Sequence, residues 1–171
     1  MCMIGSPVRN HDARPWVNKT EMKKTCMFCE IAKGNVPARI IHHDKHVVAF
    51  LPKDMNVKGH TLVAPVRHWD TLFAMPKQDA ARLMHGIKQL AALLKSRLGA
   101  DGINILHASG QVAQQSVMHV HFHLIPRYRN DGLDAWPPLP EWQGDVEKLL
   151  HQLRSKKTKG HPTKRCTAAV Q

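Results

Sequence analysis

Three histidines at alternate positions, His119, His121 and His123, are the residues of this chain best suited to chemistry. Apolar residues fill the positions between them. On a β-strand, successive side chains point to opposite faces, so the three imidazoles would share one face. Histidine titrates near neutral pH and serves as an acid, a base, a nucleophile or a metal ligand. The stretch therefore predicts a strand with a row of imidazoles on one face and a core-facing apolar surface on the other.

Cys26 and Cys29 form a Cys-x-x-Cys pair in the first quarter of the chain. In a chain without features of secretion, four cysteines indicate reduced thiols or a metal site instead of a disulfide framework. The pair alone leaves two interpretations open, which are two buried thiols or two metal ligands. The remaining cysteines, Cys2 and Cys166, lie near the ends and are candidates for neither.

The charge of the chain is concentrated at its ends. Of the formal net charge of +12, residues 1–25 contribute +3 (five basic, two acidic) and residues 154–171 contribute +6 (six basic, none acidic). Basic ends are usually solvated, and a minority bind nucleic acid or anionic lipid. We therefore expect a flexible arm at 1–22, one domain at 23–153 and a disordered basic tail after it. Nucleic acid is an expected partner only through these tails.

The length of 171 residues and the hydrophobic content of 43% suit one domain with a real core. No run of eighteen apolar residues and no apolar signal segment is found, so no membrane partner is expected and the predicted location is cytoplasmic.

Hydrophobic periodicity predicts the elements that must position the histidines and cysteines. Apolar residues at three- and four-residue steps predict a helix of about twenty residues between Pro76 and Gly99. Strands are expected at 39–42, 46–50, 60–65, 103–107 and 117–125, and short helices at 30–35 and 145–153. Most of these strands follow one another with short connections, so an antiparallel α+β architecture is predicted.

The segment from His119 to Ile125 resembles the His-φ-His-φ-His-φ-φ signature of the histidine triad (HIT) family. Further motifs match in the same order: Lys58-Gly-His to Pro65, Gln115-Ser116, and Ile125-Pro126-Arg127. The resemblance implies a five-stranded antiparallel sheet with one long and one or two short helices, and a homodimer. It also implies hydrolysis or transfer at the α-phosphorus of a nucleoside phosphoramidate or dinucleoside polyphosphate, with a purine nucleotide or nucleotide conjugate as substrate.

The resemblance assigns roles to five residues. His121 would be the nucleophile that forms a covalent nucleotidyl-histidine, and His123 would contact the phosphate or the leaving group. His60 would line the same pocket and orient His121. Gln115 and Ser116 match positions whose side chains or backbone N–H groups reach phosphate oxygens, and donors aimed at developing charge are usually the largest catalytic term.

The spacing of Cys26, Cys29 and His68, with His119 as the fourth ligand, resembles that of a zinc-carrying branch of the family. Two thiolates and two imidazoles, all from the protein, are the tetrahedral ligand set of a closed, structural zinc site. In this interpretation His119 anchors its segment to the metal, and the other two histidines of the triad stay free for substrate.

Two positions depart from the family pattern. Pro52 stands where the family usually has an aspartate or asparagine for the ribose, and Ala108 stands where it usually has an amide near the phosphates. Asp54 could take over the ribose if the segment stays extended, in which case Lys53 points away; otherwise the contact is missing. The departures keep a non-catalytic nucleotide- or partner-binding protein open as the alternative to an enzyme. Processing of nucleic-acid ends is the third interpretation, and the aromatic content of 5% gives it little support.

The other histidines are interpreted as structural or solvent-exposed, among them His42, His43, His85 and His107.

Overall fold

The computed structural model describes residues 26–55, 57–136 and 138–155. The chain divides into two compact units, of which the first ends at Leu133 and the second begins at Asp134. The predicted arm at 1–22 lies outside the described residues, as does the predicted tail from residue 156 on. The predicted domain, 23–153, therefore includes parts of both units.

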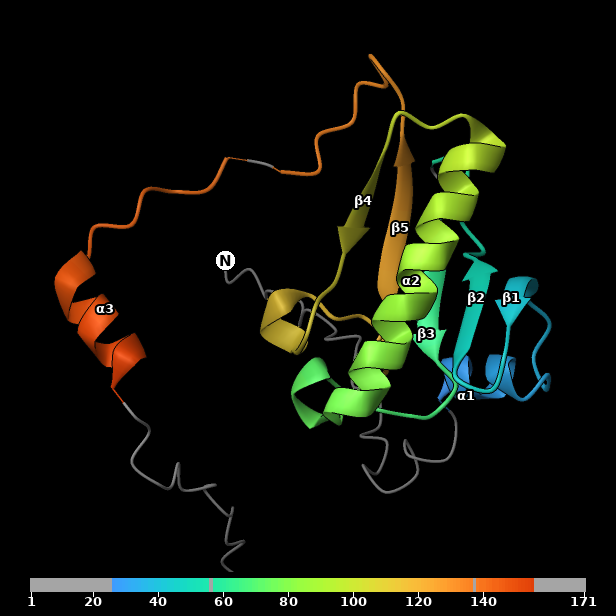
Figure 1. The fold of residues 1–171 in the computed structure, drawn as a ribbon, viewed down its shortest axis with the longest axis horizontal. Helices are drawn as coiled ribbons and strands as arrows, with labels where there is room; N and C mark the ends of the chain where they lie inside the picture. The colour runs from blue at the N-terminus through green and yellow to red at the C-terminus, as the bar shows by residue number, and fades with distance from the viewer. Residues whose placement is uncertain (1–25, 56, 137, 156–171) are drawn as a thin grey trace, which may run out of the picture. The chain divides into compact units, whose positions relative to one another are not determined.

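Five antiparallel strands form the sheet of the first unit, in the order β1-β2-β3-β5-β4 (Figure 1). The strands are β1 (Arg39–His43), β2 (Val47–Leu51), β3 (Thr61–Pro65), β4 (Gly102–Leu106) and β5 (Phe122–Arg127). β1 to β3 form a meander of neighbouring strands, whereas β5 pairs with both β3 and β4. The predicted α+β fold with a five-stranded antiparallel sheet is confirmed.

The described residues contain one long α-helix and two short ones, as predicted, and two 3-10 turns, η2 (Leu72–Ala74) and η3 (Gln111–Ala113). The α-helices are α1 (Met27–Ala32), α2 (Lys77–Leu98) and α3 (Val146–Arg154). α2 ends where the sequence places its stop, because Gly99 adopts the left-handed conformation with φ 66° and its N–H bonds to the Lys95 carbonyl. α1 begins three residues before the predicted helix, directly after Cys26. Among the described residues, no helix has the length and apolarity needed to cross a membrane.

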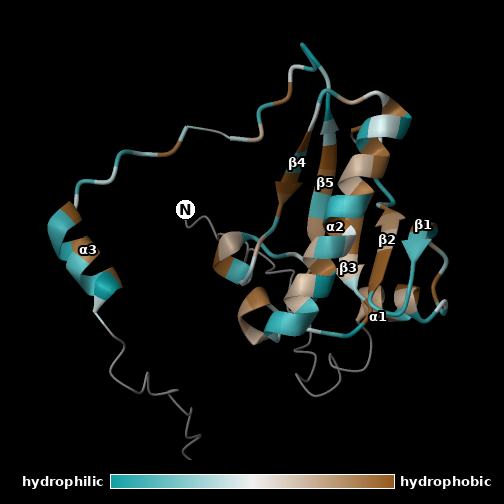
Figure 2. Cartoon of the chain, viewed as in Figure 1, coloured by the Kyte–Doolittle hydropathy of each residue, from teal (hydrophilic) through white to brown (hydrophobic). Residues whose placement is uncertain are grey.

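The central strands β2 and β3 are buried on both faces, and successive side chains of β2 point to opposite sides of the sheet. On β2, Val47 and Ala49 pack with α2, whereas Val48 and Phe50 pack with α1. Figure 2 shows β2 largely in the colour of hydrophobic residues. α2 approaches β2 closely at Gly86, where an added Cβ would lie 3.1 Å from Val47 Cγ2. The core thus consists of two layers separated by the sheet.

The histidine segment differs from its prediction in where the strand begins. β5 starts only at Phe122, so the first two histidines of the triad precede the regular strand. There the backbone bonds elsewhere: Val120 N–H donates to the Trp69 carbonyl at 2.7 Å. At the other end β5 includes Pro126, which has no N–H to donate; β3 has already ended opposite Leu124, so no bond with β3 is lost. The alternation of faces survives, since Val120 and Leu124 lie in the core beside α2.

Candidate active site and metal cluster

The three predicted catalytic histidines lie side by side on one face of the sheet. His60, directly before β3, places its Nε2 at 2.9 Å from Nδ1 of His123 on β5. The rings of His121 and His123 are 5.2 Å apart between centroids. The pairing of β3 with β5 brings these residues together, since Leu62 lies opposite His123.

His121 has the orientation that a nucleophile requires. Its Nδ1 lies 2.7 Å from the His119 carbonyl, and because a carbonyl only accepts, Nδ1 carries the proton and Nε2 keeps its lone pair. The side chain is buried, with 6% of the residue exposed, and this burial lowers the pKa of His121. The imidazole is therefore neutral at neutral pH, with Nε2 available for attack or coordination.

His60 and His123 form a pair of neutral imidazoles that one hydrogen bond joins. Burial, together with the neighbouring His121 and His60, lowers the pKa of His123 to about 4. Burial also lowers the pKa of His60. One ring must donate and the other accept across the 2.9 Å contact. Because its Nδ1 is engaged, His123 keeps Nε2 for a ligand.

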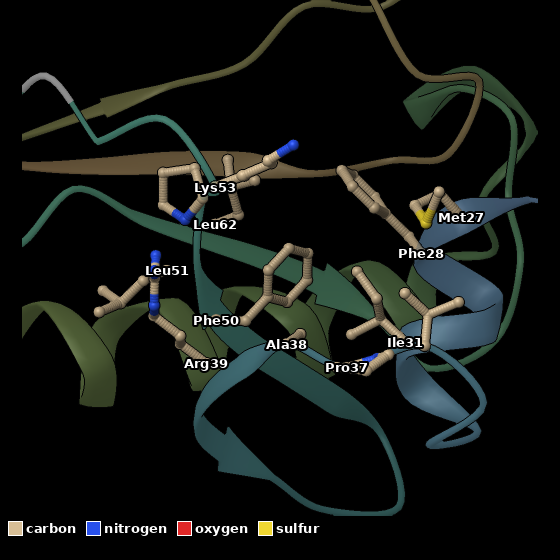
Figure 3. A pocket seen from close by; sticks show the side chains of 12 residues that line it. Met27, Phe28, Ile31, Pro37, Ala38, Arg39, Phe50, Leu51, Lys53 and Leu62 are labelled. Atoms are coloured by element: carbon tan, nitrogen blue, oxygen red, sulfur yellow. The ribbon is translucent and has the colours of Figure 1, made fainter.

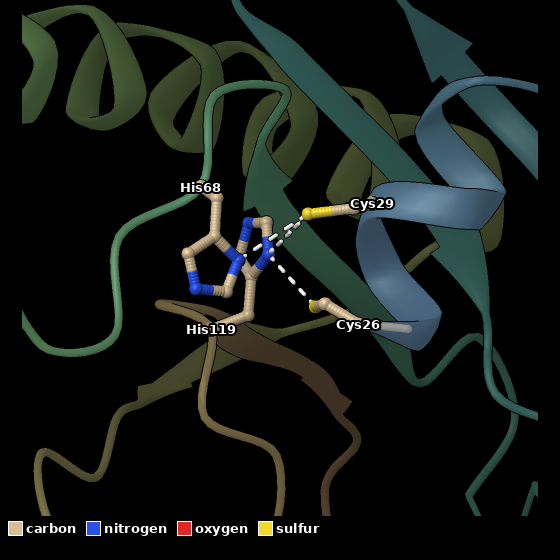
Figure 4. A group of neighbouring side chains, drawn as sticks. All are labelled: Cys26, Cys29, His68 and His119. Atoms are coloured by element: carbon tan, nitrogen blue, oxygen red, sulfur yellow. Dashed lines mark hydrogen bonds between the residues drawn. The ribbon is translucent and has the colours of Figure 1, made fainter. Parts of the chain in front are cut away.

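The four predicted metal ligands form one cluster (Figure 4). Their ligand atoms all lie within 4.8 Å of one another. His119 Nδ1 is 3.4 Å from Cys26 Sγ and 3.6 Å from Cys29 Sγ, and His68 Nδ1 is 3.3 Å from Cys29 Sγ. In a tetrahedron with metal–sulfur and metal–nitrogen bonds of usual length, neighbouring sulfur and nitrogen atoms lie about 3.6 Å apart. The spacing therefore fits a four-coordinate ion.

Both histidines of the cluster have their outer nitrogen held by an acceptor. His119 Nε2 lies 2.9 Å from the Pro65 carbonyl, and His68 Nε2 lies 2.8 Å from Oδ1 of Asp70. These contacts place the proton on Nε2 and leave the lone pair of Nδ1 facing the thiols. Metal-bound histidines usually have such partners, which fix the tautomer and the ring orientation.

Burial favours the neutral forms of Cys29 and His119. Burial lowers the pKa of His119 to about 4, so its imidazole stays neutral. Burial is also the main reason why the pKa of Cys29 rises to about 11, and a hydrogen bond with Cys26 adds to it. A nearby cation would favour the thiolate. The four residues could hold a metal ion, as the sequence predicts.

The two predicted phosphate contacts differ in their surroundings. Gln115 is buried, and its amide is fully engaged: Oε1 accepts from Gly110 N–H at 2.7 Å, and Nε2 donates to the carbonyls of Asp70 and Val117 at 2.6 and 2.9 Å. It holds the loop before the triad. Ser116 is exposed, and its hydroxyl has no hydrogen-bond partner in the described part of the chain. Phosphate binding by either residue stays a prediction.

An apolar cavity of about 650 Å³ lies next to His121, with Phe28 between them, and the sequence motifs do not predict it (Figure 3). Phe28 of α1 and Phe50 of β2 meet there edge to face, 5.3 Å apart. Phe28 also meets the His121 ring at 5.1 Å and 88°. The lining residues are Met27, Phe28, Ile31, Val36, Pro37, Ala38, Arg39, Phe50, Leu51, Pro52, Lys53 and Leu62. They come from α1, β1, β2, β3 and the segments next to them, and the aromatic and aliphatic ones each have the pattern of a core residue in the sequence.

None of the described residues that line the cavity has a carboxylate. Pro52 lines the cavity, and so does Lys53, which would point away if the segment were extended. The difference arises because the chain bends at Lys53 and does not stay extended. Asp54 is exposed and is not among the residues that line the cavity. Ribose binding by Asp54 stays a prediction.

The family model of the HIT domain matches residues 33–130, which is more than half of the chain. The chain belongs to the HIT family. An uncharacterised HIT-like protein of Methanocaldococcus jannaschii is 46% identical over 107 residues, which cover 63% of this chain and 82% of that protein. The Schizosaccharomyces pombe adenosine 5'-monophosphoramidase is 31% identical over 134 residues, 77% of this chain and 98% of the enzyme.

Among solved structures, a zinc-bound histidine triad family protein of Mycobacterium smegmatis is similar, with a TM-score of 0.62 and 33% identity. The match covers 67% of this HIT chain and 85% of the mycobacterial one. Together with the Cys/His cluster, this similarity fits the zinc-carrying branch of the HIT family.

Proposed function

We propose that this HIT protein is a hydrolase or transferase that acts at the α-phosphorus of a nucleoside phosphoramidate or dinucleoside polyphosphate. The observation that carries the proposal is the state of His121. Its Nδ1 is held by the His119 carbonyl at 2.7 Å, its pKa is lowered by burial, and its ring adjoins an apolar cavity. A neutral imidazole with a free, oriented Nε2 is an activated nucleophile.

The reaction takes place in two displacements at the same phosphorus. His121 Nε2 attacks the α-phosphorus, and the bond to the leaving nitrogen or oxygen breaks with its electron pair, while the leaving group takes up a proton. Water then attacks the nucleotidyl-histidine and loses a proton, the nitrogen–phosphorus bond breaks, and the mononucleotide and free imidazole are released.

His123 and His60 assist the displacement. If His60 Nε2–H donates to Nδ1 of His123 across their 2.9 Å contact, Nε2 of His123 carries a proton and can donate to a phosphate oxygen or the leaving group. His60 thereby sets the tautomer of His123 and, through it, the polarity of the site. Ser116, whose hydroxyl has no partner among the described residues, supplies a further donor, while Gln115 shapes the loop that presents it.

The apolar cavity receives the purine base. Its size and its aromatic and aliphatic lining suit a flat, largely apolar ring, and ligand pockets of this kind typically measure about 300–1,000 Å³. Phe28 lies between the base site and the nucleophile, because it lines the cavity and contacts the His121 ring. A base against Phe28 and Phe50 would bring its α-phosphate to the histidines.

The metal cluster binds a structural zinc ion. Cys26, Cys29, His68 and His119 provide the donor set and the spacing described above, and a bound zinc would crosslink α1, the segment after β3 and the triad. The chain's own contribution is the orientation of the ligands: Pro65 and Asp70 hold the outer nitrogens of the two imidazoles. Since His119 also positions His121, the metal site supports the nucleophile without touching substrate.

We also propose that the protein is a cytoplasmic homodimer. β4 is an edge strand, and Ile105 on it is 44% exposed, so a second copy could pair along this edge. The free thiols of Cys26 and Cys29 suit a reducing compartment.

A non-catalytic nucleotide-binding protein is the second candidate, and the observation that favours it is Pro52. This residue lines the cavity at the position where the family has a polar side chain, so the ribose loses a charge-assisted contact.

The test uses purified protein with adenosine phosphoramidate, diadenosine polyphosphates and adenylated DNA. The wild type should turn over one of the first two substrate types, and a quenched reaction should show nucleotide mass on the protein. His121→Ala should abolish turnover and still bind nucleotide, while His43→Ala, an exposed histidine of β1, should behave as wild type. Retained activity in His121→Ala would refute the nucleophile, and nucleotide binding without turnover in the wild type would establish the second candidate.

A further inference from the structure

His107 lies directly after β4, at the point where the sheet stops holding the histidine segment. The last pair of the β4–β5 ladder joins Leu106 to His123. The next residue, His107, is outside the strand; the register brings it opposite Phe122, the first residue of β5, and His121 precedes that residue outside the strand. The nucleophile therefore lies just beyond the regular backbone hydrogen bonds, where its carbonyl needs another partner.

The imidazole of His107 provides that partner. Its Nδ1 lies 2.8 Å from the His121 carbonyl oxygen, and because a carbonyl only accepts, Nδ1 is the donor. The ring also stacks on Phe122 at 4.4 Å between centroids with 17° between planes. The side chain thus continues, one residue further, the crosslink that backbone groups form within the sheet.

Ser109 fixes the tautomer that this bond requires. His107 Nε2 lies 2.7 Å from Ser109 Oγ, and since Nδ1 has the proton, Nε2 must accept it from the hydroxyl. Ser109 Oγ in turn accepts from Leu72 N–H at 3.1 Å. The chain of donors runs in one direction, from Leu72 through Ser109 and His107 to His121.

We propose that His107 is a positioning residue for the nucleophile, holding the His121 backbone from one side while the His119 carbonyl holds its ring from the other. His107 and Ser109 flank Ala108, where the family usually has an amide. This chain therefore has an imidazole and a hydroxyl next to the position of that amide. The inference rests on the proposed function, because it assigns His107 an effect on the rate of nucleotidyl transfer to His121.

Three variants separate the two hydrogen bonds from packing. His107→Phe keeps an aromatic ring on Phe122 and removes both bonds. His107→Asn keeps a donor close to the place of Nδ1. Ser109→Ala leaves the ring and removes the proton that fixes its tautomer. His43→Phe, on the exposed side of β1, is the matched control.

The measurement is single-turnover formation of nucleotidyl-enzyme from adenosine phosphoramidate, together with KM and thermal stability. Displacement of a reacting group by about 1 Å can cost about a hundredfold in rate, so His107→Phe should slow formation by about tenfold to a hundredfold with KM changed less than about twofold. His107→Asn should recover most of the rate, and Ser109→Ala should lie between. In ¹⁵N spectra of the wild type, His107 should have a protonated Nδ1 and an unprotonated Nε2.

A merely structural role would lower the thermal stability of His107→Phe and leave its rate unchanged. That result would overturn the inference. So would a His107→Asn variant that forms nucleotidyl-enzyme as slowly as His107→Phe, or wild-type spectra in which Nε2 of His107 carries the proton. Wild-type protein that forms no nucleotidyl-histidine would overturn the proposed function and this inference with it, whereas active wild type with equally active His107→Phe would overturn the inference alone.

Discussion

Asp70→Asn should weaken the proposed zinc site without removing any of its four ligands. Oδ1 of Asp70 accepts from His68 Nε2 at 2.8 Å, and this bond turns Nδ1 of His68 toward Cys29. Asparagine keeps an oxygen acceptor at the same place. The substitution removes the negative charge of the carboxylate, and it is this charge that makes the ligating nitrogen a stronger base.

The size of the effect follows from the exposure of the pair. Outer partners of metal-bound histidines contribute about 10–100-fold in affinity. The side chains of His68 and Asp70 are 41% and 59% exposed, so solvent screens the lost charge and the lower end applies. A tenfold loss equals about 1.4 kcal/mol. At fixed free zinc well above both dissociation constants, the unfolding free energy falls by that amount, which lowers Tm by about 3–6 °C.

The assay is competition for zinc against a chelator of known affinity, followed by thermal unfolding in zinc buffer and again after metal removal. Asp70→Asn should bind zinc about tenfold more weakly, and its Tm deficit should vanish without metal. His68→Ala should lose far more, because it removes a ligand. Asp134→Asn, in the second unit, serves as the control. Unchanged zinc affinity in Asp70→Asn, or a Tm deficit that persists in full after metal removal, would refute the reasoning.

Three further predictions concern the triad, the core and the base pocket. Burial lowers the pKa of His123 from 6.5 to about 4. Between these two pH values the unfolded chain binds more protons than the folded one, so the unfolding free energy should fall as the pH decreases. Denaturant titrations of His123→Phe should show a smaller loss of stability over this range, and an unchanged pH dependence would contradict the prediction. Gly86→Ala should destabilise by about 1 kcal/mol, because overpacking against Val47 outweighs the gain in helix propensity; urea unfolding should show relief in the Val47→Ala background, and a more stable single variant would rule the close contact out. Pro52→Asp should lower KM for ribonucleotides about tenfold relative to deoxyribonucleotides, since a bond to a charged acceptor contributes roughly 1.5–3 kcal/mol. Asp54→Ala should leave the selectivity for ribose unchanged if the wild type lacks a ribose contact. If the wild type selects for ribose and this selectivity survives Asp54→Ala, the contact lies elsewhere.

The sequence predicts the strands and the long helix because each depends on a local pattern of residues. Gly99 ends α2 where expected, since few other residues adopt its left-handed conformation easily. Cys26 and His119, 93 positions apart, could be paired only through the family resemblance, and their side chains do meet.

What the sequence does not predict depends on where pairing ends. The start of β5 at Phe122 cannot be predicted from periodicity, because the alternation of histidines and apolar residues continues before it, where Val120 bonds to the Trp69 backbone instead. For the same reason His107 has the pattern of an ordinary strand-end histidine, although its ring reaches the His121 carbonyl. The apolar cavity escapes notice because Phe28 and Phe50 are indistinguishable from core residues until α1 is placed beside β2.

One residue, His119, connects the metal cluster to the nucleophile. One side chain supplies Nδ1 to the metal cluster and holds the Pro65 carbonyl through Nε2, and the same residue's own carbonyl orients the ring of His121. The carbonyl belongs to the backbone and would remain with any side chain at 119, but its place depends on how the two ring nitrogens hold the residue. We therefore expect a substitution at 119 to disturb the metal cluster and the orientation of the His121 ring together. A substitution of Cys26 or Cys29 should reach His121 only through His119.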